Sequence, residues 1–439
     1  HADIRALMSA CQVLHVSWSG RSARDNSEQP PSVLVSQLRD EIDQLWGTGS
    51  AQRLTTVHPL QAFSRRYFES GSPLQTFAHE WQAVSAATPA LSDAPHPSAQ
   101  PLPPMDAAQG LPVLTLAQWQ AFVRRPVAAF FRQRLGVDLR QERTELPDEE
   151  RFGLSGLDLY GLLDEALQHG LGELGTDTLP THVRATLQRW RLAGELPLAG
   201  VGQLAAERLG SELHRLLAQA IEVQQAWPEP APHLAIDALH PAVRLQDSLE
   251  GLRRRSTHPL TGEPGAHTAW IVLRASRVAE LSDAGQVRPQ PEKLLGVWLG
   301  QLAANASGLP LWAVVVGRGA LLHSPPLPQA QAQAQLNALL EVWAEGMRWP
   351  LPLPPRIALA WLQRPEISPA LVDLYEGDGF ESAGVAADDP ALQRTYPTLA
   401  ELMAGGHLER LAPLVFGPLL AWTAQLHGQA LADAQEALA

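Results

Sequence analysis

The sequence lacks the features that define several large classes of protein. It has one cysteine, Cys11, in 439 residues, which excludes an internal disulfide framework and a cysteine-based zinc cluster and is typical of a reducing compartment. It has no run of about 18 apolar residues and no basic-then-apolar start, so neither a membrane-spanning helix nor a signal peptide is predicted. We therefore expect a cytoplasmic protein without membrane contact.

Motifs of nucleotide and metal binding are missing as well. The sequence contains no Gly-x-x-x-x-Gly-Lys-[Ser/Thr] loop, no His-Glu-x-x-His pair and no Cys/His cluster, so no metal or other cofactor is predicted. Charged residues make up 18% of the chain, and the net charge is -13. This acidic balance argues against a general polyanion-binding surface, so any contact with nucleic acid must come from a local basic patch.

The length is sufficient for two or three domains. Residues 85–112 are rich in Ala, Pro, Ser and Gln, which predicts a linker. Before it, residues 1–84 contain an alternating stretch at 13–18 that predicts a strand, and an amphipathic stretch at 32–45 that predicts a helix. We interpret residues 1–84 as the last βα piece of a larger α/β domain and, because the chain begins at His1, the whole as a fragment.

The remaining residues, 113–439, are predicted to form one α/β domain. Helical periodicity dominates residues 113–230, and again residues 324–439. Between them, residues 231–323 contain short runs of Val, Ile and Leu, one turn-rich excursion at 253–267, and a helix between two strands. This order predicts a β-β-α-β core preceded by a helical layer.

A β-β-α-β core is the catalytic core of PD-(D/E)XK nucleases. These enzymes need an acid on the first strand and acid-x-Lys on the second, because the carboxylates hold Mg²⁺ and the lysine assists at the nucleophile. The second strand here offers Leu273-Arg274-Ala275, and no register of that strand gives acid-x-Lys. The sequence therefore predicts a nuclease-like core from which the cleavage chemistry is missing, and not an enzyme.

Clustered arginines are the candidates for DNA contact. A guanidinium binds phosphate strongly, although any single basic cluster is more often a solvated face or an ion-pair partner. The triplet Arg253-Arg254-Arg255 is the strongest candidate because it opens the excursion at 253–267, which we expect to project from the domain. The candidates are Arg253, Arg254, Arg255, Arg124 and Arg125.

Three stretches carry a resemblance to a known family. They are residues 13–38, which contain Gly-Arg-Ser-x-x-Asp-Asn-Ser-Glu, residues 119–135, which read Trp-x-x-Phe-x-x-x-Pro-Val-x-x-Phe-Phe-x-x-Arg-Leu, and residues 243–308. They resemble the C-terminal part of RecC, the gamma-subunit family of bacterial exodeoxyribonuclease V (RecBCD). The resemblance covers nearly the whole chain.

The resemblance implies the end of a superfamily 1 helicase-like domain at 1–84, followed by a degenerate nuclease domain at 113–439. It implies a subunit that is not an enzyme, that splits duplex DNA with a pin-like element, guides the strands and contributes to Chi recognition in double-strand break repair and recombination. RecB-like and RecD-like subunits and DNA are the implied partners.

Individual positions can be compared with the family's active nuclease pattern. The resemblance places Glu250 at a surviving acid, Leu273 and Ala275 at the lost acid and lysine, and Tyr160 at the metal-binding histidine. In the helicase-like part it places an interface or helicase-like motif at Trp18, Arg21, Asp25 and Asn26.

Two other interpretations stay open from the residues alone. One is an active metal-dependent nuclease with displaced ligands, in which Glu250 acts with Asp237 or Asp247. The other is a module that docks partner subunits without touching DNA.

Overall fold

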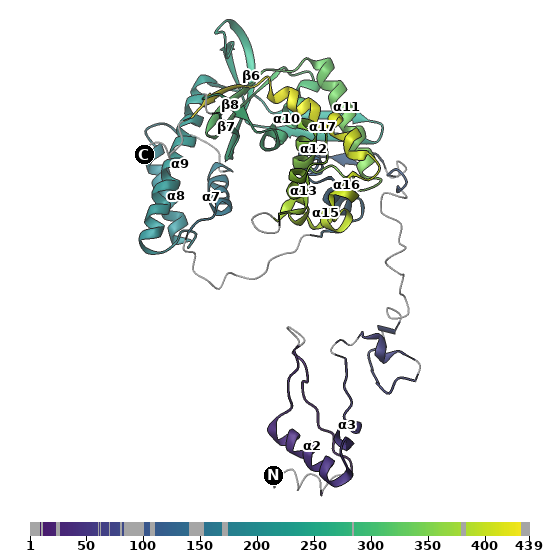
Figure 1. Cartoon of the computed structure of the whole chain (residues 1–439). Coiled ribbons are helices and arrows are strands. Elements are labelled where there is room, and N and C mark those ends of the chain that lie inside the picture. The colour runs from purple at the N-terminus through teal and green to yellow at the C-terminus, as the bar shows by residue number, and fades with distance from the viewer. Residues whose placement is uncertain are drawn as a thin grey trace. The chain divides into compact units, whose positions relative to one another are not determined.

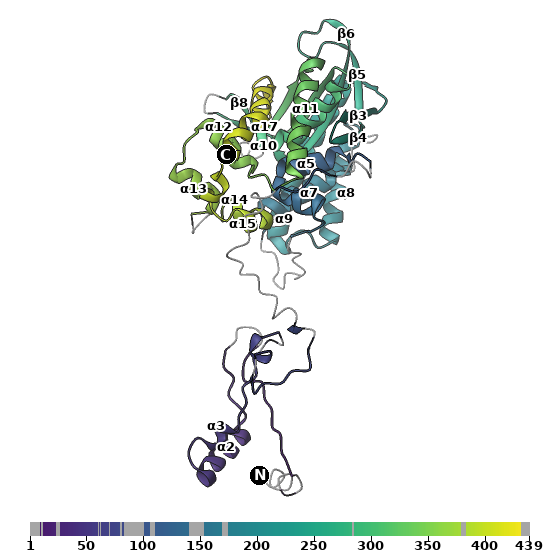
Figure 2. The same ribbon diagram turned by 90° about the vertical axis from the view of Figure 1, so that its right-hand side faces the viewer.

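A computed structural model gives the structure of the chain. It describes residues 9, 12–22, 27–59, 61, 63–69, 71–79, 81–82, 101–105, 110–139, 153–168, 174–282, 285–378 and 383–431. Two compact units divide the chain, residues 1–95 and residues 96–439, and each is described by itself (Figures 1 and 2).

The regular elements described in unit 1 are helical. The helix predicted at 32–45 is present as α2 and has no buried residue. The strand predicted at 13–18 is wrong: residues 14–20 have no regular structure, and the described part of this segment forms one isolated bridge, between Arg21 and Glu28. An alternating pattern forms a strand only where a neighbouring backbone pairs with it. The elements are α2 (Val33–Trp46), α3 (Ser50–Arg53) and the 3-10 turn η1 (Arg65–Tyr67).

The centre of unit 2 is a six-stranded sheet in the order β11-β10-β9-β6-β5-β2. Strand β6 pairs antiparallel with β5 and parallel with β9, and α10 (Pro291–Ala306) makes the crossover. This is the predicted β-β-α-β arrangement in an α/β fold. The strands are β2 (Glu229–Pro230), β5 (Leu252–Thr257), β6 (Pro264–Arg277), β9 (Leu311–Arg318), β10 (Ala320–Ser324) and β11 (His427–Ala430).

The first strand of this core differs from the prediction. Strands β3 (Leu234–His240) and β4 (Val243–Leu249) join β1 (Val113–Leu114) in a separate three-stranded sheet. The antiparallel partner of β6 is instead β5, inside the stretch predicted as a turn-rich excursion. The sequence did not predict β5, because three consecutive arginines are not typical of a strand and this strand forms through its pairing with β6 more than through local propensity. The β5–β6 hairpin does project from unit 2, as Figures 1 and 2 show.

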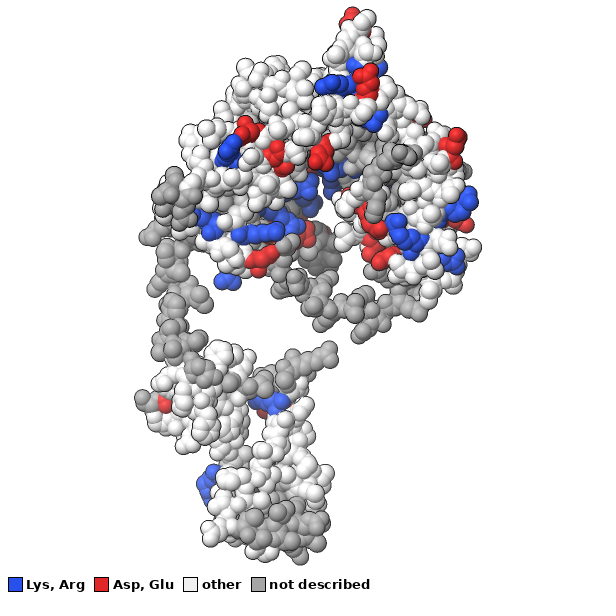
Figure 3. Space-filling model, turned by 180° about the vertical axis from the view of Figure 1, so that it is seen from behind, with Lys and Arg blue, Asp and Glu red and all other residues white. Residues whose placement is uncertain are grey.

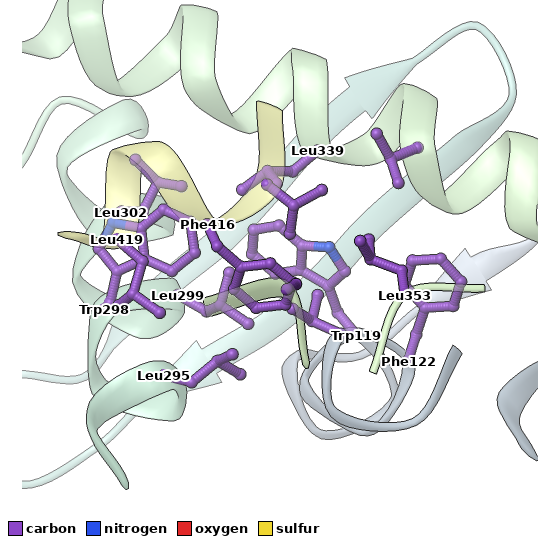
Figure 4. Close-up of a cluster of buried hydrophobic side chains, with 14 of the residues drawn as sticks. Trp119, Phe122, Leu295, Trp298, Leu299, Leu302, Leu339, Leu353, Phe416 and Leu419 are labelled. Atoms are coloured by element: carbon purple, nitrogen blue, oxygen red, sulfur yellow. The ribbon is translucent and has the colours of Figure 1, made fainter. Parts of the chain in front are cut away.

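Helices cover both faces of the six-stranded sheet. Alternate residues of β6 divide between the two cores: Ala275 belongs to the cluster with α7 (Gly156–Gln168) and α9 (Ala199–Ala226), and Val272 belongs to the cluster around α10. Strand β9 is buried along nearly its whole length, as a parallel strand covered on both sides requires. Figure 4 shows the larger core, with Trp119, Trp298 and Phe416 among its labelled side chains.

Gly300 of α10 sets how closely β6 approaches this helix. A Cβ atom at Gly300 would lie 2.5 Å from the Trp270 ring, whereas one at Gly296 would lie at an ordinary contact distance, 3.5 Å, from a terminal guanidinium nitrogen of Arg274. The absence of a side chain at Gly300 therefore lets the Trp270 ring pack across α10, and Arg274 lies beside the same helix one turn away. This packing places Arg274 at the site described below.

The other elements of unit 2 complete the two helical layers. The capping box of Thr115 and Gln118 begins α5, and residues 101–105, from the stretch predicted as a linker, lie against this unit, where the Leu102 N–H donates to the Arg348 carbonyl. No helix in the described ranges is long and apolar enough to cross a membrane. The remaining elements are α5 (Leu116–Arg124), α6 (Pro126–Ala129), the π-helical turn η3 (Phe130–Arg134), α8 (Leu179–Leu192), β7 (Ala279–Leu281), β8 (Val287–Pro289), α11 (Gln329–Gly346), α12 (Pro355–Gln363), α13 (Pro369–Glu376), α14 (Gly384–Ala387), α15 (Pro390–Thr395), α16 (Leu399–Met403) and α17 (His407–Thr423).

Candidate nucleic-acid interface

A basic cavity of about 850 Å³ lies in unit 2, where the end of β6 meets the starts of α7, α10 and α12. The whole chain has 33 basic and 46 acidic residues, yet basic residues predominate here, so the local potential opposes the net charge. Figure 3 shows lysine and arginine side chains gathered around a hollow in the face of this unit. The basic lining residues are Arg124, Arg125, Arg274, Arg277, Lys293, Arg318 and Arg356, and the acidic ones are Glu292, Asp388 and Asp389.

The first turns of three helices also line this cavity. Gly156 of α7, Glu292 and Lys293 of α10, and Arg356 of α12 all belong to its walls. The N-terminal end of a helix carries a partial positive charge and backbone N–H groups without intrahelical partners. These helix ends add to the side-chain charges and favour an anion in the cavity.

Arg274 lies at the centre of this arrangement. The Nε atom of its guanidinium is buried and has no hydrogen-bond partner among the described residues. Burial, together with the nearby charge of Arg124, lowers the pKa of Arg274 from its usual range, whereas Tyr160 and Asp164 act in the opposite direction. A buried cation with an unsatisfied donor gains from an anion that accepts its hydrogen bond.

Several of the charged groups in the cavity already have partners. The Arg318 Nε donates to the Glu212 carboxylate at 2.7 Å, and the Asp389 carboxylate caps α15 by accepting from the backbone N–H groups of Ala391 and Leu392. Besides Arg277, which is exposed and also has a partner, four basic side chains of the lining are exposed. They are Arg124, Arg125, Arg356 and Lys293, the last being the one lysine in the sequence.

Two further cavities share walls with the basic cavity. One of about 700 Å³, between α7, β5 and β6, shares Tyr160 and Arg274 with it. Another of about 550 Å³, along α5 and α6, shares Arg124, Arg125 and Asp389 with it. Each of these two cavities therefore adjoins the basic cavity.

The positions compared with a nuclease active site lie partly at these cavities. Tyr160 and Ala275 line the basic cavity, and Leu273 lines the 700 Å³ cavity. Ala275 is 1% exposed and packs, like Leu273, with the helices on the α7 side of the sheet. Glu250 is exposed in the turn between β4 and β5 and lines none of these three cavities.

The acids considered as displaced metal ligands are engaged elsewhere. Asp237 on β3 accepts two hydrogen bonds from Arg244, which lowers its pKa. Asp247 on β4 accepts from the Leu116 backbone N–H at 2.8 Å. Among the residues that the structure describes, no three His, Cys, Asp or Glu side chains gather closely enough to hold a metal ion.

The arginine triplet of β5 is largely used within the fold. The Arg253 guanidinium donates to the carbonyls of Trp227 and Pro228 at the end of α9. The Arg255 guanidinium lies 5.4 Å from the Trp227 ring centroid and donates to the Thr257 hydroxyl. Two members of the triplet thus fasten the hairpin to α9, and Arg254 is exposed.

The positions compared with a helicase-like motif lie in unit 1. Arg39 lies 5.9 Å from the Trp18 ring centroid, in cation–π geometry. Arg21 pairs with Glu28 at 3.1 Å. Asp25 and Asn26 lie outside the described residues.

Comparison with known proteins gives the family. The family model of the RecC C-terminal domain matches residues 112–366, more than half of the chain. The chain belongs to the RecC C-terminal domain family. The RecC match spans the β-β-α-β core and every basic residue that lines the 850 Å³ cavity.

Curated RecC proteins match over a longer range. The RecBCD enzyme subunit RecC of Escherichia coli (strain K12) is 30% identical over 389 residues, 82% of this chain and 30% of that protein. The subunit of Haemophilus influenzae is 26% identical over 348 residues, which are 78% of this chain and 28% of that protein. The subunit of Mycobacterium tuberculosis is 27% identical over 375 residues, which are 82% of this chain and 30% of that protein. The chain thus spans about 30% of the length of these RecC proteins.

The sequence indicated some of the cavity and missed the rest. Arg124 and Arg125 were singled out as a doublet and line the cavity, and Arg274 drew attention only as part of a broken motif. Lys293 and Arg356 have no basic neighbour in the sequence. They line the same cavity because both α10 and α12 begin at its wall.

Proposed function

We propose that this chain is part of a DNA-handling subunit of a RecBCD-type helicase–nuclease, and that it binds and guides DNA in double-strand break repair and recombination without cutting it. RecB-like and RecD-like subunits are its partners in this proposal. The basic cavity is the observation that carries it, together with membership of the RecC family.

The electrostatics of the cavity support DNA as the ligand. In an acidic chain, a polyanion is repelled from most of the surface and attracted only where cations gather. The cavity offers guanidinium groups, one ammonium and three helix N-terminal ends to phosphate oxygens. Phosphate contacts of this kind fix the position of a nucleic acid without reading its sequence.

The walls of the cavity support binding without cleavage. Hydrolysis of a phosphodiester by a PD-(D/E)XK mechanism needs carboxylates converging on a metal ion and a lysine beside them. Leu273 and Ala275 occupy the corresponding strand positions in an apolar environment, and Asp237 and Asp247 are held by Arg244 and Leu116. We infer a degenerate nuclease domain whose remaining role is to shape and position DNA.

The projecting β5–β6 hairpin is the proposed duplex-splitting element. Residues 258–263 form its tip, where Leu260 is 46% exposed, and the imidazole of His258 packs edge-on against Trp312 at 5.3 Å. A hairpin that exposes a leucine at its tip can insert this apolar side chain between base pairs as they separate. A contribution to Chi recognition is included in the proposal on the strength of the family alone.

Binding and cleavage of a forked DNA duplex test the proposal together. We expect the chain to bind the fork with an affinity that falls as salt rises, and to release no nucleotides in Mg²⁺ or Mn²⁺. Arg124→Ala with Arg125→Ala weakens binding, whereas Arg184→Ala with Arg191→Ala, two exposed arginines of α8 that line none of the three cavities, serves as the matched control. Cleavage that is lost in Glu250→Ala would establish an active nuclease instead.

A docking module is the second candidate function. Exposed apolar residues gather where α8 ends and α9 begins: Leu192 is 80% exposed, Leu198 69% and Val201 50%. Such a patch is typical of protein–protein contacts. If the chain captures RecB-like or RecD-like subunits but no fork at any salt concentration, docking is its function and DNA binding is not.

A further inference from the structure

We propose that the tip of the β5–β6 hairpin is a proton-sensitive turn, which the neutral imidazole of His258 holds closed and which opens when that imidazole takes up a proton. The tip consists of residues 258–263, at the far end of the hairpin that projects from unit 2 (Figures 1 and 2). The inference goes beyond the proposed function and holds whether or not the hairpin separates duplex DNA.

The backbone of the tip forms a single helical turn. The His258 N–H donates to the Glu263 carbonyl at 2.7 Å, and the His258 carbonyl accepts from the Gly262 N–H at 3.0 Å. Gly262 has a φ of +74°, the left-handed conformation in which many helical turns end. Pro259 opens the turn, where the missing N–H of proline is no loss. The N–H groups that follow Pro259 need an acceptor from outside the turn.

The side chain of His258 supplies that acceptor. Its Nδ1 atom accepts from the backbone N–H groups of Leu260 at 3.3 Å and Thr261 at 3.1 Å. Because both partners are donors, Nδ1 holds a lone pair and the proton of the neutral ring lies on Nε2. Acceptance from the second and third N–H groups after the residue is the N-cap arrangement. Asn, Asp, Ser and Thr usually fill this position, and here a titratable imidazole takes their place.

Protonation of His258 removes the cap. A proton on Nδ1 makes this atom a donor that faces two other donors, so both hydrogen bonds are lost. The N–H groups at the start of the turn also carry partial positive charge, which repels an imidazolium. Histidine side chains change charge between about pH 5 and 8. The turn is therefore closed at the upper end of this range and opens as the pH falls, which releases the backbone of Leu260.

The rings packed against His258 limit how the proton can be shared. The His258 imidazole lies edge-on against Trp312 of β9, with 5.3 Å between ring centroids, and against His267 of β6, with 5.2 Å. Burial, followed by the charges of His258 and Arg255, lowers the pKa of His267. The two imidazoles therefore do not readily carry positive charge together, and His267 is a poor alternative site for the proton.

The charged groups near the tip differ between its two sides. On the sheet side, Arg255 is the cross-strand partner of His267 and also acts on His323 of β10, which lies opposite His427 of β11. On the tip side, the Glu263 carboxylate accepts from the Thr261 hydroxyl at 3.3 Å. A charged His258 is therefore repelled by the sheet side and attracted toward Glu263, away from the cap position.

Hydrogen–deuterium exchange of the full chain tests the proposal at the two capped amides. Exchange is measured by mass spectrometry with fragmentation to single amides, and each rate is divided by that of an unstructured peptide of the same sequence at the same pH. Loss of an N-cap changes an equilibrium by about two- to thirtyfold. We expect the protection of the Leu260 and Thr261 amides to fall by a factor in this range between about pH 7.5 and about pH 5.5. The amides of β9, which is buried along nearly its whole length, should keep their protection and so exclude global unfolding.

Three variants separate the cap from other effects of pH. His258→Asn offers an oxygen to the same two N–H groups and does not titrate, so both amides should stay protected at either pH. His258→Ala leaves no acceptor, and both amides should exchange fast at either pH. His214→Asn removes an exposed imidazole from α9 and should leave the pH dependence of the tip unchanged.

Each alternative result decides against the proposal. Protection that does not change with pH in the unaltered chain overturns it, as does full protection of both amides in His258→Ala. If the pH dependence survives in His258→Asn and disappears in His267→Gln, the proton acts through His267 and the assignment to His258 is wrong.

Discussion

The salt dependence of fork binding can be worked out from the cavity lining. Of its seven basic residues, Arg318 is paired with Glu212 and Arg277 also has a partner. Five remain to contact phosphates: Arg124, Arg125, Arg274, Lys293 and Arg356. Each phosphate contact releases counterions, so affinity falls as the salt concentration rises.

The expected magnitude follows from the number of contacts. Five contacts give a slope of log K against log salt of about -3.5 for a single strand and about -4.5 for a duplex. Raising salt from about 50 to about 200 mM should then weaken binding about a hundred- to five hundredfold. Arg124→Ala with Arg125→Ala leaves three contacts, a slope of about -2.1 to -2.7, and a loss of about twenty- to fortyfold.

Fluorescence anisotropy of a labelled fork at several salt concentrations measures both slopes. The control variant, Arg184→Ala with Arg191→Ala, removes the same charge from α8 and should leave the slope unchanged. A slope that is the same in both variants would refute the reasoning, because the long-range effect of net charge would then explain the binding and the cavity would not.

Three further predictions concern the fold. Trp298→Ala removes a side chain with 0% exposure and should lower the free energy of unfolding in urea by about 3–5 kcal/mol, whereas Leu192→Ala, at an 80% exposed position, should change it by less than about 0.5 kcal/mol. Thr115→Ala removes the capping box of α5 and should cost about 1 kcal/mol, and Thr115→Ser, which keeps the hydroxyl, should restore most of it. Burial, then the charges of Arg255 and His427, lower the pKa of His323 below its ordinary 6.5. The stability that the neutral imidazole contributes is therefore complete above pH 6.5 and is lost as the pH falls below 6.5, where the unfolded chain takes up the proton first. His323→Gln should accordingly show a smaller loss of stability between about pH 7.5 and 5.5 than the unaltered chain.

The elements that could be predicted from the sequence are those whose residue pattern does not depend on a partner elsewhere in the chain. The β-α-β unit of β6, α10 and β9 could be predicted because continuous apolar runs on either side of a buried helix have few other arrangements. Strand β5 could not, because its arginines owe their conformation to β6 and to the carbonyl groups at the end of α9. Nothing within residues 231–249 shows that β4, the hairpin partner of β3, also pairs with the distant two-residue strand Val113–Leu114.

The site was predictable to the extent that its charges are adjacent in sequence. Arg124 and Arg125 form a visible doublet, whereas Lys293 and Arg356 acquire meaning only from where α10 and α12 begin. For the triplet at 253–255 the difficulty was the reverse. A conspicuous cluster of charge turned out to include two guanidinium groups already bound to carbonyl or aromatic partners, which local sequence cannot reveal.

The two ends of the six-stranded sheet differ in whether another strand can join them. At one end β2 consists of Glu229 and Pro230, and proline has no backbone N–H to donate to a further strand. At the other end β11 pairs with β10 on one side, and all four of its residues are exposed. An extended peptide that adds a strand beside β11 therefore meets backbone N–H groups of a kind that Pro230 does not have at the opposite end of the sheet. The same difference favours the β11 end over Pro230 as the place where sheets of two isolated chains would pair edge to edge.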